Sequence, residues 1–116
     1  MNTLPHFLCI GTQKAGTSWF FHQIRQHPDV WLPPIKELHF FDHLYCPENR
    51  SWTSRHIQSV ADRILSRQRS KSKVNLAFVE YVTYLKGESM FTEKWYIRAF
   101  DRPGAKGKVT GDVTPS

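Results

Sequence analysis

The fold class is decided by residues 6–18, HFLCIGTQKAGTS, which hold an apolar run, two glycines and a threonine-serine pair. The apolar run, His6–Ile10, is typical of a strand buried in a parallel sheet. Gly11 and Gly16 then predict a tight loop. The apolar spacing of Thr17–Gln26 predicts a helix that stops before a proline. The chain therefore opens with a strand, a glycine loop and a helix.

A glycine loop between a strand and a helix favours anion binding, because backbone N–H groups and the positive helix end converge there. Lys14 adds a full charge, and Thr17 and Ser18 add hydroxyl groups. The two glycines have the spacing of the Walker pattern G-x-x-x-x-G-K-[ST], but Thr17 stands where that pattern has its lysine. The displaced lysine weakens the case for a kinase or ATPase, and a plain tight turn with a solvated lysine stays open as an alternative.

The rest of the chain continues the alternation of strands and helices. We predict an extended piece at Val30–Leu32, a turn or short helix at Lys36–Leu44 with Phe40 and Phe41 buried, a helix at Ser51–Gln68, a basic loop at Ser66–Lys73, a strand at Asn75–Val82, a helix at Phe91–Phe100 and a strand at Lys108–Val113. Three tryptophans, Trp19, Trp52 and Trp95, are expected in the core. No repeat or linker is evident, so residues 1–116 are taken as one α/β domain with a parallel sheet flanked by helices.

Composition limits the function classes. Apolar residues make up 40% of the 116 residues and charged residues 22%, as in globular proteins. The formal charge of +6 favours an anionic partner, and the basic run Arg63–Lys73 is either a solvated helix end or a contact for an anionic acceptor. Cys9 and Cys46 form no disulfide or zinc framework, and Cys9 is expected to be a buried thiol. Without a visible signal peptide or apolar span, we expect a cytoplasmic protein that binds no membrane.

Three segments resemble the sulfotransferases that use 3′-phosphoadenosine 5′-phosphosulfate (PAPS), above all their heparan-sulfate-type and bacterial branch. Residues 7–18 resemble the loop that binds the 5′-phosphosulfate. Lys36–Asp42 (KELHFFD) is similar to the family segment K-E-x-H-F-F-D, and Gly111–Ser116 (GDVTPS) is similar to G-E-x-[TS]-P-x-Y. The resemblance implies a fold like that of the P-loop nucleotide hydrolases.

The resemblance also implies roles for individual residues. The cofactor-binding residues would be Gln13, Lys14, Ala15, Gly16, Thr17 and Ser18. Lys14 would stabilise the charge that develops on the leaving phosphate. Glu37 would take the proton of the acceptor, a small molecule or carbohydrate, and His39 would assist it. The family needs no metal for this chemistry.

Several alternatives remain at this point. Glu37 could be a solvated loop carboxylate, and His39 and His43 have the i, i+4 spacing of a metal pair, although ordinary polar histidines explain them as well. Asp112-Val113 lacks the lysine that many heparan-sulfate enzymes carry there. The chain could instead be a P-loop kinase or NTPase, or a non-catalytic basic module for nucleic acid or a sulfated polymer. No known nucleic-acid-binding pattern is present, so we expect no nucleic-acid partner.

The family holds the 3′-phosphate of PAPS with a segment that follows the one resembled by residues 111–116. We therefore expect the chain to be the N-terminal part of an incomplete sulfotransferase domain, with a complementing C-terminal half as a possible partner. The strand that ends near Val113 would then expose an unpaired edge.

Overall fold

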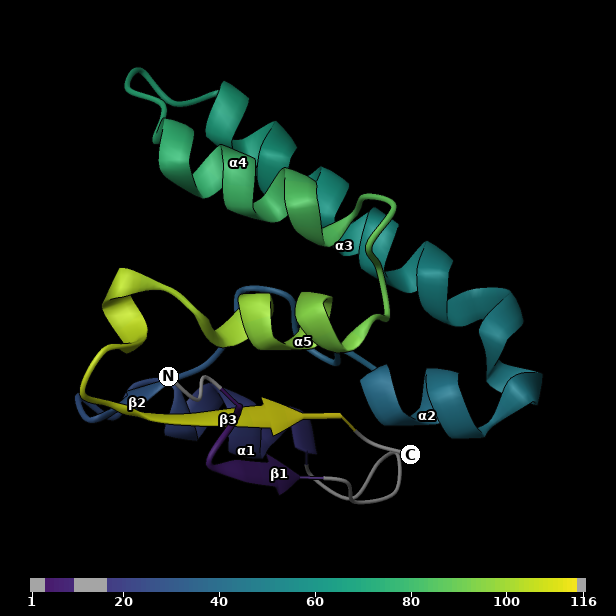
Figure 1. Cartoon of the computed structure of the whole chain (residues 1–116). Helices are drawn as coiled ribbons and strands as arrows, with labels where there is room; N and C mark the ends of the chain where they lie inside the picture. The colour runs from purple at the N-terminus through teal and green to yellow at the C-terminus, as the bar shows by residue number, and fades with distance from the viewer. Residues whose placement is uncertain (1–3, 10–16, 115–116) are drawn as a thin grey trace. The chain divides into compact units, whose positions relative to one another are not determined.

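The computed structural model describes residues 4–9 and 17–114, which divide into two compact units. The sheet unit comprises residues 1–39 and 96–116, and the helical unit comprises residues 40–95. Figure 1 shows the strands of the first and the helices of the second. Each unit is described separately below.

The sheet unit is built on three parallel strands. They are β1 (Phe7–Cys9), β2 (Val30–Trp31) and β3 (Val109–Val113), in the spatial order β1-β3-β2. The helix α1 (Thr17–Ile24) connects β1 to β2. A mixed α/β structure with a small parallel sheet is thus confirmed, whereas the assignment to the P-loop class stays a prediction. β3 lies between the other two described strands, but β2 pairs only with Val109 and Thr110, so at Val113 β3 is paired with β1 alone.

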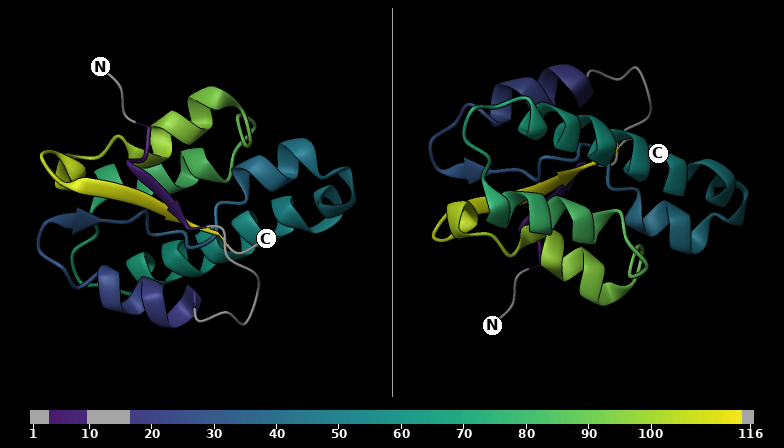
Figure 2. Two further views of the ribbon diagram at one scale, coloured as in Figure 1. Left: turned by 90° about the horizontal axis from the view of Figure 1, so that it is seen from below. Right: turned by 90° about the horizontal axis from the view of Figure 1, so that it is seen from above.

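Successive residues of β3 face opposite sides of the sheet. Gly111 pairs with Phe7, whose ring makes an edge-to-face contact with Phe20 of α1 at 6.4 Å. Asp112 points the other way, toward Tyr96 of α5 (Glu93–Phe100), and the two are hydrogen-bonded. Figure 2 shows α1 and the second half of α5 on opposite sides of the sheet. Both faces of β3 are therefore covered, which explains why its last four residues are buried.

The helical unit contains α2 (Phe40–Tyr45), a 3-10 turn η1 (Pro47–Asn49), α3 (Arg50–Arg69) and α4 (Leu76–Leu85). The helices α3 and α4 lie side by side (Figure 1). Their shared core is apolar: Ile57, Ala61, Ile64, Leu65, Tyr81, Val82 and Leu85. Trp95, fully buried as expected, donates its indole N–H to the carbonyl of Leu85 at 2.8 Å. None of the described helices is long and apolar enough to span a membrane.

Two of the secondary-structure predictions for the helical unit are wrong. The segment Asn75–Val82 is not a strand, because α4 begins at Leu76 and Asn75 caps it by accepting a hydrogen bond from the Phe78 N–H at 3.1 Å. The segment Ser66–Lys73 is not all loop, because α3 continues to Arg69. In both places the packing of α3 and α4 against each other favours the helix, and a local sequence pattern does not contain that contact.

Burial also departs from expectation at four residues, Phe41, Trp19, Trp52 and Cys9, of which Trp52 is only partly buried. Phe41 is 42% exposed and Trp19 is 68% exposed. Phe40 and Phe41 are neighbours on a helix, so they point about 100° apart and only Phe40 is buried. On α1, Phe21 is buried and Trp19 is not. Cys9 is only partly buried.

Candidate active site at the carboxyl end of the sheet

The candidate site lies where β1 and β3 end. Ligands of open parallel sheets bind beyond the carboxyl ends of the strands. The Thr114 N–H, directly after β3, donates to the Cys9 carbonyl at the end of β1 at 2.9 Å. This bond places the end of β3 beside the point where the chain enters the glycine loop.

The predicted cofactor-binding residues fall largely outside the described part of the chain. Gln13, Lys14, Ala15 and Gly16 are not described, and Thr17 and Ser18 are described only as the start of α1. Their roles, including the catalytic role of Lys14, stay predictions.

The two other predicted catalytic residues lie together at this edge. The Glu37 Oε1 is 3.3 Å from the His39 Nε2, and its Oε2 is 3.7 Å from the Lys36 Nζ. The His39 N–H reaches the Thr114 Oγ1 at 3.5 Å, which ties the segment to the end of β3. His39 is 1% exposed, whereas a quarter of the Glu37 side chain is exposed. Glu37 is thus a carboxylate held by an imidazole and still open to solvent.

The backbone of this segment is unusual. Glu37 has φ 63° and His39 has φ 53°, the left-handed region that side chains disfavour by ~1–2 kcal/mol per residue. Ile35 and Leu38, each 1% exposed, anchor the segment on both sides of Glu37. Strained residues persist only where packing imposes them, and they concentrate at functional sites. The segment is therefore fixed in a costly conformation that presents Glu37 and His39 together.

A buried polar cluster supports this edge from within, and the sequence did not reveal it. The Asp112 carboxylate accepts hydrogen bonds from the Tyr96 hydroxyl at 2.7 Å and from the Thr114 hydroxyl at 2.7 Å. Burial, together with the neighbouring Asp112 carboxylate, raises the pKa of Tyr96 far above its usual range, so the phenol stays a donor. An acidic residue inside a buried strand needs hydrogen-bond partners, so Asp112 within β3 was the feature of the sequence that could have indicated a buried polar cluster.

A metal site at His39 and His43 is not supported by the described residues. His39 precedes α2 while His43 lies within it, so the two do not share a helix as the i, i+4 spacing requires. The His43 Nδ1 is 2.5 Å from the Thr53 Oγ1, and its ring stacks on Phe91 with centroids 3.8 Å apart. Among the described residues, no group of three or more metal-ligating side chains occurs.

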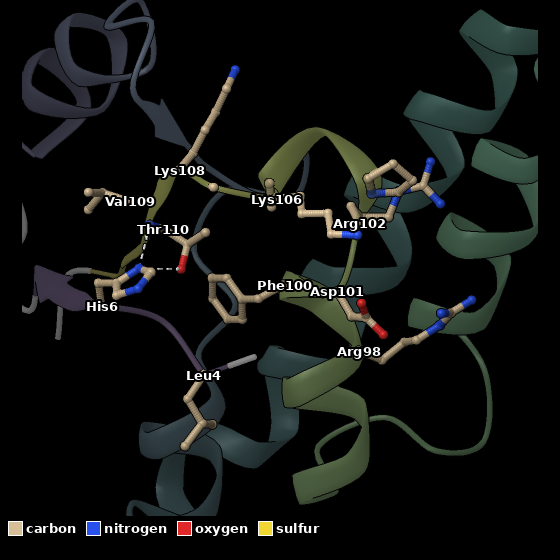
Figure 3. A pocket seen from close by; sticks show the side chains of 13 residues that line it. Leu4, His6, Arg98, Phe100, Asp101, Arg102, Lys106, Lys108, Val109 and Thr110 are labelled. Atoms are coloured by element: carbon tan, nitrogen blue, oxygen red, sulfur yellow. Dashed lines mark hydrogen bonds between the residues drawn. The ribbon is translucent and has the colours of Figure 1, made fainter. Parts of the chain in front are cut away.

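A second, basic hollow of about 890 Å³ lies at the other end of β3. Its lining includes four cations, Arg98, Arg102, Lys106 and Lys108, and one carboxylate, Asp101, and in Figure 3 the Lys108 side chain points away from Asp101. His6 and Thr110 form its far wall, where the His6 Nδ1 accepts the Thr110 N–H at 2.9 Å. The basic run that begins at Arg63 belongs to the helical unit and takes no part in this hollow.

The chain is similar over short stretches to known sulfotransferases. It is 31% identical over 55 residues to the membrane-associated sulfotransferase kil1 of Dictyostelium discoideum. It is 42% identical over 41 residues to the carbohydrate sulfotransferase 15 of Homo sapiens, and equally to that of Mus musculus. These alignments cover 47% and 35% of this chain but span only 12% and 7% of the relatives. No family profile and no solved structure matches the chain. The local similarity supports a transferase of the sulfotransferase kind.

Proposed function

We propose that this chain carries the catalytic edge of a sulfotransferase that takes a sulfuryl group from PAPS and gives it to a hydroxyl or amine acceptor. The observation that carries the proposal is the pair Glu37 and His39, held in left-handed backbone beside the ends of β1 and β3. The short stretches that are similar to known sulfotransferases support sulfuryl transfer as the class of reaction. In this proposal residues 1–116 belong to one sulfotransferase domain.

In the proposed reaction, the bond between sulfur and the phosphate oxygen of PAPS breaks while a bond forms between sulfur and the acceptor atom. The acceptor proton passes to the Glu37 carboxylate, and the phosphate leaves with the bonding electrons, its charge stabilised by Lys14. The His39 imidazole, 3.3 Å from the Glu37 Oε1, fixes the direction of that carboxylate. Lys36 places a positive charge on its other oxygen, at 3.7 Å.

The acceptor is proposed to be a carbohydrate or a small molecule. The carbohydrate option rests on the name of one group of similar proteins, the carbohydrate sulfotransferases. The exposed quarter of Glu37 leaves the carboxylate accessible to such an acceptor. Assays with labelled PAPS should therefore include sugars, phenols and amines.

The decisive experiment replaces the proposed base. Glu37→Gln should lower kcat by ~10²–10⁴-fold, because a general base contributes about that factor, and should leave PAPS affinity nearly unchanged. Glu88→Gln, an exposed glutamate of the helical unit, is the matched control and should retain the parent rate. Turnover of Glu37→Gln at the parent rate would exclude Glu37 as the base. Calorimetry with a chelator should show nucleotide binding without Mg²⁺, whereas Mg²⁺-dependent ATP binding would favour the kinase alternative.

A second candidate function, binding of a polyanion without catalysis, is favoured by the basic hollow. Residues 98–108 hold four cations and one carboxylate, and their net charge of +3 is half of the +6 of the whole chain. Replacing Lys106 and Lys108 by alanine should weaken retention on a heparin column more than replacing Lys71 and Lys73. Equal losses from the two pairs would show nonspecific attraction instead.

A further inference from the structure

We propose that Thr114 is a positioning residue for Glu37 and His39, and that Asp112 sets the direction in which the Thr114 hydroxyl points. The catalytic consequence rests on the proposed function, whereas the positioning itself does not. Four groups take part in order: the Tyr96 hydroxyl, the Asp112 carboxylate, the Thr114 hydroxyl and the His39 N–H.

The buried carboxylate determines the polarity of the chain of hydrogen bonds. Asp112 is 4% exposed, and its Oδ1 accepts a hydrogen bond from the Thr114 hydroxyl. The Thr114 hydroxyl, 2.7 Å away, must therefore direct its proton at Asp112. The same oxygen can then accept a hydrogen bond from the His39 N–H, whose nitrogen lies 3.5 Å from the Thr114 Oγ1. A hydroxyl that turned its proton toward His39 would place two donors face to face.

The His39 N–H matters because its residue holds an unfavourable backbone conformation. The φ of 53° at His39 and of 63° at Glu37 must be maintained by tertiary contacts. One such contact is the hydrogen bond from the His39 N–H to the Thr114 hydroxyl, which at 3.5 Å is long. Since the His39 ring also contacts the Glu37 carboxylate at 3.3 Å, a shift of His39 moves the proposed base.

Thr114 also acts on the other side of the site. Its N–H donates to the Cys9 carbonyl at 2.9 Å, at the end of the strand that enters the glycine loop. One residue thus links the segment that carries the proposed base to the strand that leads to the proposed cofactor loop. Loss of the hydroxyl alone leaves the backbone link intact, so the two effects can be separated.

The test compares two substitutions at one position. Thr114→Val keeps the shape and the backbone preference but removes the hydroxyl, while Thr114→Ser keeps the hydroxyl. In Thr114→Val, amide hydrogen exchange at His39 should accelerate about three- to tenfold relative to the amide of Thr110, the range expected for one net hydrogen bond. Thr114→Ser should restore the parent ratio. The Thr110 amide is a suitable reference because it lies on β3, the strand that Thr114 follows, and donates to His6 instead.

Tyr96→Phe controls for general destabilisation. It removes a hydrogen bond from Asp112 but leaves the Thr114 hydroxyl directed at the carboxylate, so the His39-to-Thr110 exchange ratio should stay at the parent value. In assays with labelled PAPS, Thr114→Val should lower kcat about three- to tenfold without raising the KM for PAPS, and Thr114→Ser should recover it.

Two results would overturn the positioning role: an unchanged exchange ratio in Thr114→Val, or an equal acceleration in Tyr96→Phe. The exchange measurement requires no turnover. If it behaves as expected while Glu37→Gln keeps the parent activity, Thr114 positions His39 and the proposed function fails on its own.

Discussion

The sheet unit and the helical unit bury different kinds of side chains. Along β3 and beside its carboxyl end, the sheet unit buries four polar residues: His39, Thr110, Asp112 and Thr114. The helical unit buries mainly apolar side chains, with Thr53 and Gln68 as its buried polar residues among those described. All buried side-chain N and O atoms of the described residues have hydrogen-bond partners. A buried polar group needs a hydrogen-bond partner in a defined position, whereas a buried apolar group does not. The positions of side chains should therefore be most tightly constrained at the edge of the sheet that holds the buried polar residues.

The largest effect should come from removing the main aromatic of the apolar core. Trp95 is fully buried, so Trp95→Ala should lower the free energy of unfolding by ~3–5 kcal/mol through lost burial and a cavity. Trp19→Ala, at a site 68% exposed on α1, is the control and should change it by no more than ~0.5 kcal/mol. Urea denaturation followed by circular dichroism measures both. A similar loss of unfolding free energy in Trp95→Ala and Trp19→Ala would contradict the assignment of Trp95 to a core and of Trp19 to the surface.

Close packing in the sheet unit gives the next largest effect. A Cβ on Gly111 would lie 2.0 Å from the Cζ of Phe7, and that ring is held against Phe20. Gly111→Ala should therefore destabilise the protein by ~1–3 kcal/mol, as overpacking does.

A second substitution tests the cause. Phe7→Leu in the Gly111→Ala background should recover part of the loss in urea denaturation, because the shorter side chain leaves room for the methyl group. If Phe7→Leu adds its own full cost with no recovery, the ring is not the reason for glycine at position 111.

The sequence predicts the sheet unit better than the helical unit. Strong local signals locate β1, α1 and β3: an apolar run, a glycine loop and a strand that ends in Thr-Pro. The spatial order β1-β3-β2 needs tertiary information, because no local pattern in the sequence says which strands pair. In Asn75–Val82 a short apolar run fits a strand or a buried helix equally well, and the packing of Tyr81, Val82 and Leu85 against α3 decides for the helix.

The candidate site was predictable only where its residues are neighbours in the chain. Glu37 and His39 were found through the resemblance of one segment, and the structure brings them within 3.3 Å. Tyr96 and Asp112 are 16 residues apart, and no local pattern couples them. The left-handed backbone at Glu37 and His39 was not foreseeable either, since neither residue type requires it.

A smaller effect tests the start of α4 in the helical unit. The Asn75 Oδ1 accepts the Phe78 N–H at 3.1 Å, so Asn75→Ala should reduce the free energy of unfolding by ~1 kcal/mol. Asn75→Asp keeps an acceptor and should retain most of the stability. Thermal denaturation of the three proteins distinguishes them, and an unaffected Asn75→Ala would mean that tertiary packing alone sets the start of the helix.

The smallest effect concerns His43, a polar residue in the apolar helical unit. Burial, and then the Arg50 guanidinium, lower the pKa of His43 below the ordinary value of a histidine, while the Asp42 carboxylate opposes them. As the pH falls below about 6.5, the unfolded chain therefore binds a proton that the folded chain resists, so stability decreases with falling pH. Urea midpoints at about pH 7.5 and about pH 5 should differ less in His43→Gln than in the parent, because the variant lacks this titration. The carboxylates are the same in both proteins, so the difference between the two pH responses isolates His43. An identical pH response would show that the stacking on Phe91 and the contact with Thr53 tolerate the imidazolium, and polar burial in the helical unit would then carry no electrostatic cost.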